Sequence, residues 1–516
     1  MNTLAATSVE SPSPFPWRWL LLAGIGSLLM RLWVAAVMPV TGDEAFFYWW
    51  GVFPAWGYSD HPPMVGWLIW LMRQTLGDSL FSIRVPVVLL PAALGGLLWW
   101  GFSAVDRVRT GWAVALFWLA PVNWLNTMIT TDTPLIFWSA LAVASLARAE
   151  RREKLDGTAW ALYALSGAAM GGAVMSKYFS ALLGLAMILY FVIHRRERLH
   201  ALALMLLCAS PGPALNIAFN MSHCWTNVMF NVYNRNSGEH TELRKPLAYI
   251  GLMVYLLTPA AVWYAVKARL DVLATLRGRP LLAMLVVVPL ACFAVLSLKK
   301  IIGLHWVLSF YPLLFVLLGW SLPAAWLQRC AKGVAVFTGL HVVVALAMGV
   351  AGMSAWQHTK LYPSVVRSIK GAEIVAQVQA PGVVVMANAY TPASIFGWAR
   401  RAYMPVFGPG RFHARQDDLL VDYSIYEGQT IRVLAPDAPN LAADYAPYFN
   451  AVRTYTITQD GAVFHVIEGT GFRFEAYRRG VLQEVNRLYY NIPTWLPMTH
   501  CGYCQRLCGA DRCSRE

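Results

Sequence analysis

The chain has 516 residues, of which 58% are hydrophobic and only 13% are charged. Soluble domains are about one quarter charged, so this chain has too little polar surface to cover itself in water. The same composition excludes a disordered, coiled-coil or collagen-like protein. What remains is a multipass membrane protein. The net charge of +14 then reflects membrane orientation and not nucleic-acid binding.

Residues 1–16 are polar, rich in Ser and Pro, and predicted to be disordered. Apolar runs long enough to cross a bilayer follow. We expect eleven transmembrane helices, near residues 17–40, 81–105, 111–128, 133–149, 158–176, 178–194, 199–219, 247–267, 280–298, 303–323 and 333–352. The first run is a retained anchor and not a signal peptide, because it is too long and no cation precedes it.

Cationic loops set the expected orientation, because Lys and Arg accumulate on the cytoplasmic side. Alternate loops carry Arg107, Arg109, Arg148, Arg151, Arg152, Lys154, Arg195, Arg196, Arg198, Lys267, Arg269, Arg277, Arg279, Arg329 and Lys332. The opposite loops hold most of the acids between the spans. The N-terminus is therefore expected in the cytoplasm, with the acidic loops and the C-terminal part outside.

The composition changes after Met353. Short apolar runs, such as 383–386 and 431–434, alternate with turn-rich segments such as 407–410, a pattern that predicts a small α/β domain. The expected fold is an all-α polytopic membrane core over residues 17–352 and an extracytoplasmic α/β domain over residues 353–470. A cysteine-containing tail of residues 471–516 follows.

Two acids, Asp43 and Glu44, stand at the outer end of the first span, before a run of aromatic residues. A solvated loop with an aromatic belt accounts for the rings but not for two carboxylates at the membrane edge, where charge is costly and usually functional. Neighbouring residues on a helix point about 100° apart. The two acids are therefore candidates for different tasks.

Further polar residues lie at later outward turns. Asp132 is either an N-cap of the helix that follows or a catalytic acid, and one residue can do both. Lys177, Lys299 and Lys300 break the inside-positive pattern. Ammonium groups at these positions are suited to bind a phosphate carried by a lipid. The alternative is that the lysine side chains extend along the membrane to the lipid headgroups. His305 is either a packed helix residue or a ligand.

Several motifs are missing from the sequence. No complete G-x-G-x-x-G, G-x-x-x-x-G-K-[ST], H-E-x-x-H or D-x-D pattern occurs, so nothing points to a cytoplasmic nucleotide. A divalent metal near Asp43 is compatible with the acids, but no metal motif demands it. No cofactor is required by the sequence.

The eight cysteines form two groups. The first group lies in or near the predicted spans and suits packing: Cys208, Cys224, Cys292 and Cys330. The second crowds the tail beside His500: Cys501, Cys504, Cys508 and Cys513. For the tail, disulfides, a zinc site and free thiols stay open, with an oxidising exterior favouring disulfides.

The first outer loop resembles that of the bacterial GT-C glycosyltransferases, which are related to the dolichyl-phosphate-mannose protein mannosyltransferases and the lipid A aminoarabinose transferase. The resemblance rests on Gly-Asp-Glu at 42–44, Trp-Gly-Tyr at 56–58 and Asp-His-Pro-Pro at 60–63. The turns at 131–132 and 176–178 and the segment 299–312 resemble later family blocks. Segments 410–418 and 489–493 resemble the C-terminal region of some bacterial members.

The resemblance implies a helical core in the bacterial inner membrane with a cavity at its periplasmic face. There a polyprenyl-phosphate sugar, drawn from among the membrane lipids, passes its sugar to a lipid (lipid A included), glycan or protein acceptor. Asp43 matches the family's essential acid, and Glu44 and Asp132 match secondary acids. The implied substrate-binding residues are Tyr58, Asp60, His61, Lys177, Tyr178, Lys299, Lys300 and His305.

Two other functions are compatible with a polytopic chain: a transporter or flippase of polyprenyl-linked glycans, and an assembly subunit without chemistry. Transporters place polar residues near the middle of spans and often contain inverted repeats. Here the acids cluster in outer loops, and the two halves of the chain do not mirror each other. The depth of the charged residues therefore discriminates between transport and transfer.

Overall fold

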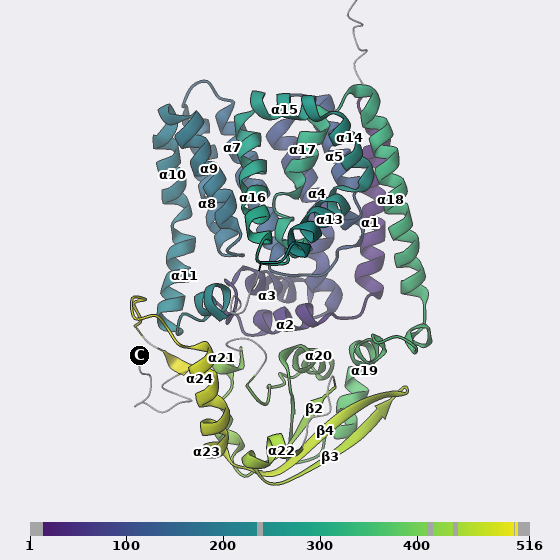
Figure 1. Ribbon diagram of the computed structural model, residues 1–516, viewed down its shortest axis with the longest axis vertical. Helices are drawn as coiled ribbons and strands as arrows, with labels where there is room; N and C mark the ends of the chain where they lie inside the picture. Colours follow the sequence, from purple (N-terminus) through teal and green to yellow (C-terminus); the bar gives the residue numbers. More distant parts are fainter. Residues whose placement is uncertain (1–13, 235–240, 410–415, 437–441, 500, 504–516) are drawn as a thin grey trace, which may run out of the picture.

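The computed structural model describes residues 14–234, 241–409, 416–436, 442–499 and 501–503. A helical bundle forms one end of the molecule, and a sheet with its own helices forms the other (Figure 1). Helices α2 (Gly42–Val52) and α3 (Met64–Leu76) lie between the two parts. The predicted disordered N-terminus lies outside the described residues, apart from residues 14–16.

Mostly apolar helices of 9 to 27 residues build the bundle. They are α1 (Trp17–Val37), α4 (Leu80–Phe102), α5 (Arg107–Leu119), α7 (Asp132–Glu150), α8 (Gly157–Val174), α9 (Ser180–His194), α10 (Leu199–Ala209), α11 (Pro211–Ser222), α13 (Arg244–Leu257), α14 (Pro259–Lys267), α15 (Arg269–Gly278), α16 (Pro280–Ser297), α17 (Tyr311–Ser321) and α18 (Ala324–Val350). Short helical turns connect them: α6 (Val122–Leu125), α12 (Thr226–Val228), η2 (Met229–Tyr233) and η4 (Leu304–Val307).

The prediction of a multipass membrane protein is confirmed, whereas the count of eleven spans is not. Each predicted run contains helix, but of the described helices only α1, α4, α16 and α18 are long and apolar enough to cross a bilayer. The number rises to six if two bent pairs, α10 with α11 and α13 with α14, each count as one span. Helices α9 and α17 are apolar but shorter.

Local sequence signals explain where several helices begin. Asp106 accepts a hydrogen bond from the backbone N–H of Arg109 at 2.9 Å and so caps α5. Asp156 caps α8 by accepting one from Ala159 at 2.8 Å. Such caps satisfy amide groups that have no partner inside the helix. Both helices therefore start at positions that the sequence specifies.

The predicted α/β segment contains a four-stranded sheet. Its strands are β1 (Val383–Ala387), β2 (Thr430–Ala435), β3 (Phe449–Gln459) and β4 (Ala462–Phe472), in the order β1-β2-β4-β3. Strands β1 and β2 are parallel, and the other two pairs are antiparallel. Both apolar runs identified in the sequence form strands. Helices of this part are α19 (Tyr362–Val378), α20 (Tyr390–Arg400), α21 (Asp417–Leu420), α22 (Ala442–Tyr445), α23 (Phe474–Tyr477) and α24 (Gln483–Tyr489).

The predicted boundary between the α/β segment and the tail, at residue 470, falls inside β4. Side chains beyond it, including Tyr477, Leu482 and Tyr503, are buried in the same apolar cluster as Ile431 and Ile467 of the sheet. The first part of the tail therefore packs as a continuation of the sheet-containing layer.

Candidate active site

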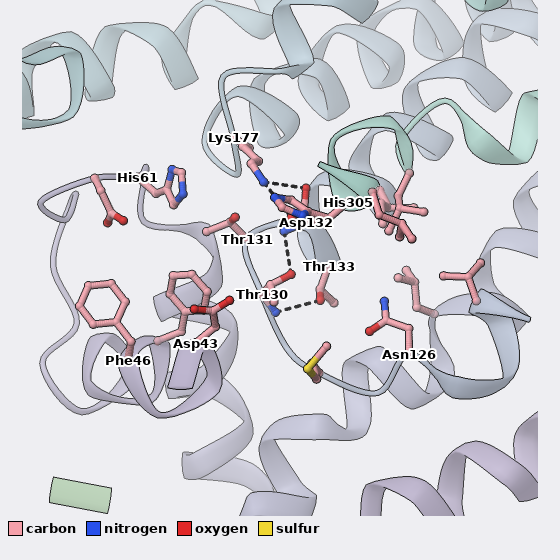
Figure 2. Close-up of a pocket in the computed structure, with 18 of the residues that line it drawn as sticks. Asp43, Phe46, His61, Asn126, Thr130, Thr131, Asp132, Thr133, Lys177 and His305 are labelled. Atoms are coloured by element: carbon pink, nitrogen blue, oxygen red, sulfur yellow. Dashed lines mark hydrogen bonds and ion pairs between the residues drawn. The ribbon is translucent and has the colours of Figure 1, made fainter. Parts of the chain in front are cut away.

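A cavity of about 1070 Å³ lies where α2, α7 and the connections between helices meet. Figure 2 shows Asp43 and Phe46 of α2 on one wall, with Asp132, Lys177 and His305 across from them. Polar groups occupy this part of the lining. Apolar side chains, among them Leu90, Ile136 and Leu308, line the rest. The cavity thus joins a charged compartment to an apolar one.

Asp43 is held in place by its neighbour Glu44. The two residues occupy the first turn of α2, where Thr41 and Glu44 form a reciprocal capping box. The Glu44 carboxylate also accepts hydrogen bonds from Nε and Nη2 of Arg84, each at 2.7 Å, and both side chains are fully buried. The same guanidinium donates to carbonyl groups at the end of α1, including that of Met38 at 2.7 Å. Arg84 therefore fixes the start of α2, and with it the direction in which Asp43 points.

This geometry separates the two acids that the sequence groups together. Asp43 lines the cavity, whereas Glu44 lies outside the described lining with both carboxylate oxygens engaged. A catalytic role for Glu44 stays a prediction, and its contacts suit a positioning role. The two neighbouring acids thus occupy different places, and that they have different tasks stays a prediction.

The environment of Asp43 favours its protonated form. Burial among the surrounding atoms raises the pKa of the Asp43 carboxyl above its ordinary value, the Lys177 ammonium opposes that rise, and the carboxylates of Glu44 and Asp132 add to it. Perturbed carboxyl groups in a cavity are typical of functional sites. An acid with a raised pKa is suited to accept a proton during a reaction.

Asp132 and Lys177 form an ion pair on the opposite wall. The Lys177 ammonium donates to both carboxylate oxygens of Asp132, at 2.9 and 2.8 Å, and the side chains are only 8% and 6% exposed. The capping alternative for Asp132 is not observed: it is the first residue of α7, and the cap position belongs to Thr131. Asp132 instead holds the one lysine among the described residues that line the cavity.

The structure brings some of the predicted binding residues to the cavity and leaves others outside. Asp60, His61 and His305 line it together with Asp43, Asp132 and Lys177. The rest lie outside the described lining: Tyr58, Tyr178, Lys299 and Lys300. Tyr58 is fully buried, and its hydroxyl donates to the Trp50 carbonyl at 2.7 Å. The Lys299 carbonyl accepts a hydrogen bond from Lys245.

The cavity also contains residues that sequence reasoning missed. Asn126 and Thr130 come from the connection before α7, Asn234 follows η2, and Tyr390 begins α20 in the sheet-containing layer. The Tyr390 ring lies 5.0 Å from that of Phe46. Nothing in the sequence marks Tyr390, because its place in the site depends on how the sheet-containing layer docks. Arg84 did carry a signal, since an arginine within an apolar run needs a specific partner.

One disulfide joins the two predicted cysteine groups. Cys224 and Cys501 are bonded, which corrects the prediction that Cys224 only packs. The open question for Cys501 is resolved in favour of a disulfide, but with a partner 277 residues away. Across the described ranges no group of three or more metal-ligating side chains occurs. His500 and the remaining tail cysteines, Cys504, Cys508 and Cys513, lie outside those ranges.

Comparison with known proteins confirms the resemblance to GT-C glycosyltransferases found in the sequence. The family model described as dolichyl-phosphate-mannose-protein mannosyltransferase matches residues 60–212. That stretch contains Asp60, His61, Asp132 and Lys177, and it begins after Asp43. No curated protein matches the chain in a sequence comparison.

Two crystal structures of ArnT from Cupriavidus metallidurans share the fold. The apo structure aligns with a TM-score of 0.60 and 16% identity over 87% of this chain and 98% of that one. The structure bound to undecaprenyl phosphate gives the same TM-score and identity over 88% and 98%. The oligosaccharyltransferase AglB from Archaeoglobus fulgidus, in complex with an inhibitory peptide and a dolichol-phosphate, aligns with a TM-score of 0.48 and 12% identity over 87% and 74%. The two ArnT structures show that nearly nine tenths of this chain follows one known architecture.

Proposed function

We propose that this chain is an integral membrane glycosyltransferase that moves a sugar from a polyprenyl-phosphate donor to an acceptor at the outer face of the membrane. The observation that carries the proposal is the placement of Asp43 across a cavity from the buried Asp132–Lys177 pair. The bound undecaprenyl phosphate in one ArnT structure supports the donor class. The sheet-containing layer would then lie in the bacterial periplasm, with the N-terminus in the cytoplasm.

The residues suit the two halves of the reaction. When the bond between the anomeric carbon and the donor phosphate breaks, its electron pair leaves with the phosphate, and positive charge develops on the sugar ring. The Lys177 ammonium is the described cation that would stabilise the leaving phosphate. Asp132 holds this ammonium in the cavity until an anion arrives.

Asp43 would serve the acceptor. A hydroxyl acceptor forms the new bond to the anomeric carbon and loses its proton, which the Asp43 carboxylate takes up. A phosphate acceptor needs no base, and Asp43 would then orient it and stabilise the charge on the ring. In both cases the Asp43 carboxylate must be ionised before the reaction. The raised pKa of Asp43 therefore sets the pH below which sugar transfer falls.

The depth of the acids favours transfer over transport. Asp43 is the second residue of α2, Asp132 is the first residue of α7, and Asp60 lies in a connection. Acids at helix starts surround one compartment and do not mark a path through the middle of spans, where transporters bind their substrates. A flippase of polyprenyl-linked glycans remains the alternative function, and the experiment below separates the two.

The test is mass spectrometry of envelope lipids and glycans from a strain that lacks the gene. We expect one sugar mass to disappear and to return with the wild-type gene but not with Asp43→Asn. Asp271→Asn is the matched control, because this exposed acid lies in α15 at the end of the bundle away from the cavity. Full restoration by Asp43→Asn would overturn the proposed role. Accumulation of the intact polyprenyl-linked sugar on the cytoplasmic side would indicate a flippase.

A further inference from the structure

The end of the chain returns to the membrane core as a strap, defined here as residues 489–499 and 501–503. Several contacts join this C-terminal strap to the segment 221–234, which begins in the last turn of α11. The Cys224–Cys501 disulfide is one. The Thr499 amide donates to the Met221 carbonyl at 3.0 Å, Trp225 Nε1 donates to the Pro497 carbonyl at 2.8 Å, and Asn234 Nδ2 donates to the Tyr489 carbonyl at 3.1 Å.

The strap holds a backbone conformation that the segment would not adopt alone. Cys224 and Trp225 have φ values of 57° and 51°, in the left-handed region. Non-glycine residues rarely adopt this conformation, which persists only where the surrounding structure enforces it. The disulfide and the Trp225 hydrogen bond act at these same two residues. Strain of this kind is commonly found beside functional sites.

Asn227, which is fully buried, lies two residues after Trp225. Its Nδ2 donates to the Tyr58 carbonyl, and its Oδ1 accepts from the Tyr178 hydroxyl at 3.0 Å. One helical turn later, Asn231 Nδ2 donates to the Asp60 carbonyl at 2.8 Å. Asn227 therefore connects the 58–61 loop, which brings Asp60 and His61 to the cavity, with the turn that carries Lys177.

We propose that the C-terminal strap, through the Cys224–Cys501 disulfide, and Asn227 position the 58–61 loop and so set the affinity of the cavity for its sugar-phosphate substrate. Asn227 and both cysteines are positioning residues, since none of them lies in the described lining. The effect on affinity rests on the proposed function, whereas the positioning of the loop does not. The proposed positioning requires the oxidised Cys224–Cys501 disulfide, which is the state expected outside the cytoplasm.

Hydrogen exchange of the full-length protein in detergent tests the positioning without any substrate. A water-soluble phosphine reduces the disulfide, taking up the oxygen of one water molecule and leaving two thiols. We expect amides of residues 57–61 to exchange at least about tenfold faster in the reduced protein and in Cys224→Ser/Cys501→Ser, while α7 and α8 stay protected. The control is Cys292→Ser, a free cysteine in α16. Unchanged exchange at residues 57–61, or an equal rise throughout the chain, would overturn the proposal.

Kinetics with the transferred polyprenyl-phosphate sugar test the consequence for binding. Displaced binding groups far from the reacting bond cost on the order of 10- to 100-fold in kcat/KM. We expect this loss in the double serine variant and in Asn227→Ala, expressed as a higher donor KM with kcat changed less than about twofold. Reoxidation of the reduced wild type should restore KM. A fall in kcat with KM unchanged would refute the role in affinity. If the wild type transfers no sugar, the proposed function fails, and the exchange result still decides the positioning.

Discussion

Replacing Glu44 by glutamine separates a positioning role from a catalytic one. The Glu44 carboxylate accepts two hydrogen bonds from Arg84, each at 2.7 Å, and neither side chain is exposed. Removing one partner of such a pair costs about 3–5 kcal/mol, because the other charge stays buried without compensation. Glutamine keeps one acceptor oxygen, so we expect Glu44→Gln to lower the free energy of unfolding by about 3 kcal/mol. Arg84→Met should cost more, since it also removes donors to the end of α1.

The assay combines thermal unfolding of purified protein in detergent with sugar transfer per folded molecule, measured well below the unfolding midpoint. Loss of a general base lowers the rate by about 10²- to 10⁴-fold, which is the expected result for Asp43→Asn. Glu44→Gln should retain at least about one tenth of the turnover, because the acid that faces the cavity is intact. A variant with the wild-type midpoint and turnover as low as that of Asp43→Asn would refute this reasoning and make Glu44 catalytic.

Three further predictions follow from single contacts. Because the pKa of Asp43 is raised in the folded protein, its protonated carboxyl stabilises the fold below the ordinary Asp pKa, and this stabilisation is lost as the pH rises through the raised pKa. Asp43→Asn should therefore raise the thermal unfolding midpoint at neutral pH. A lowered midpoint would contradict this prediction. Arg31 donates a hydrogen bond to the Val87 carbonyl, which has no helical donor because Pro91 lacks an N–H. Arg31→Met should therefore lower the free energy of unfolding by about 2–3 kcal/mol, and by less in a Pro91→Ala background. Equal losses in both backgrounds of this double-mutant cycle would refute the coupling. A Cβ on Gly42 would come within 2.5 Å of Thr391 Cγ2, so Gly42→Ala should displace α20 from α2 and raise the KM for substrate. Unchanged kinetics would show that the Thr391 side chain moves aside without displacing α20.

The sequence predicts the charged part of the cavity better than its surroundings. Asp43, Asp132 and Lys177 stand at the ends of apolar runs, where a charge has few structural explanations, and all three line the cavity. Lys299 and Lys300 follow the same logic and lie outside the described lining. The rotation of the turn after α16 decides where those side chains point, and no local pattern encodes it.

Contacts between distant segments are the part that the sequence does not reveal. Tyr390 reaches the cavity only because α20 packs on α2, and Cys224 meets Cys501 across 277 residues. The pairing of cysteines cannot be deduced from their number or spacing. Strands β1 and β2 were predicted, because short apolar runs between turns have few other structural solutions. Strands β3 and β4 were not, although the Asp460-Gly461 turn between them is a typical hairpin signal.

The Cys224–Cys501 bond also restricts how the chain threads the bilayer. Its two Cα atoms are 4.7 Å apart, so both cysteines lie on the same side of a hydrocarbon layer about 30 Å thick. The chain between them must therefore cross an even number of times. Helices α16 and α18 account for two crossings, and counting the bent pair α13–α14 as a third would leave an odd total. Because α15, which follows the bent pair, lies at the end of the bundle away from the cavity, the bent pair crosses the bilayer, and the short α17 supplies the fourth crossing that parity requires.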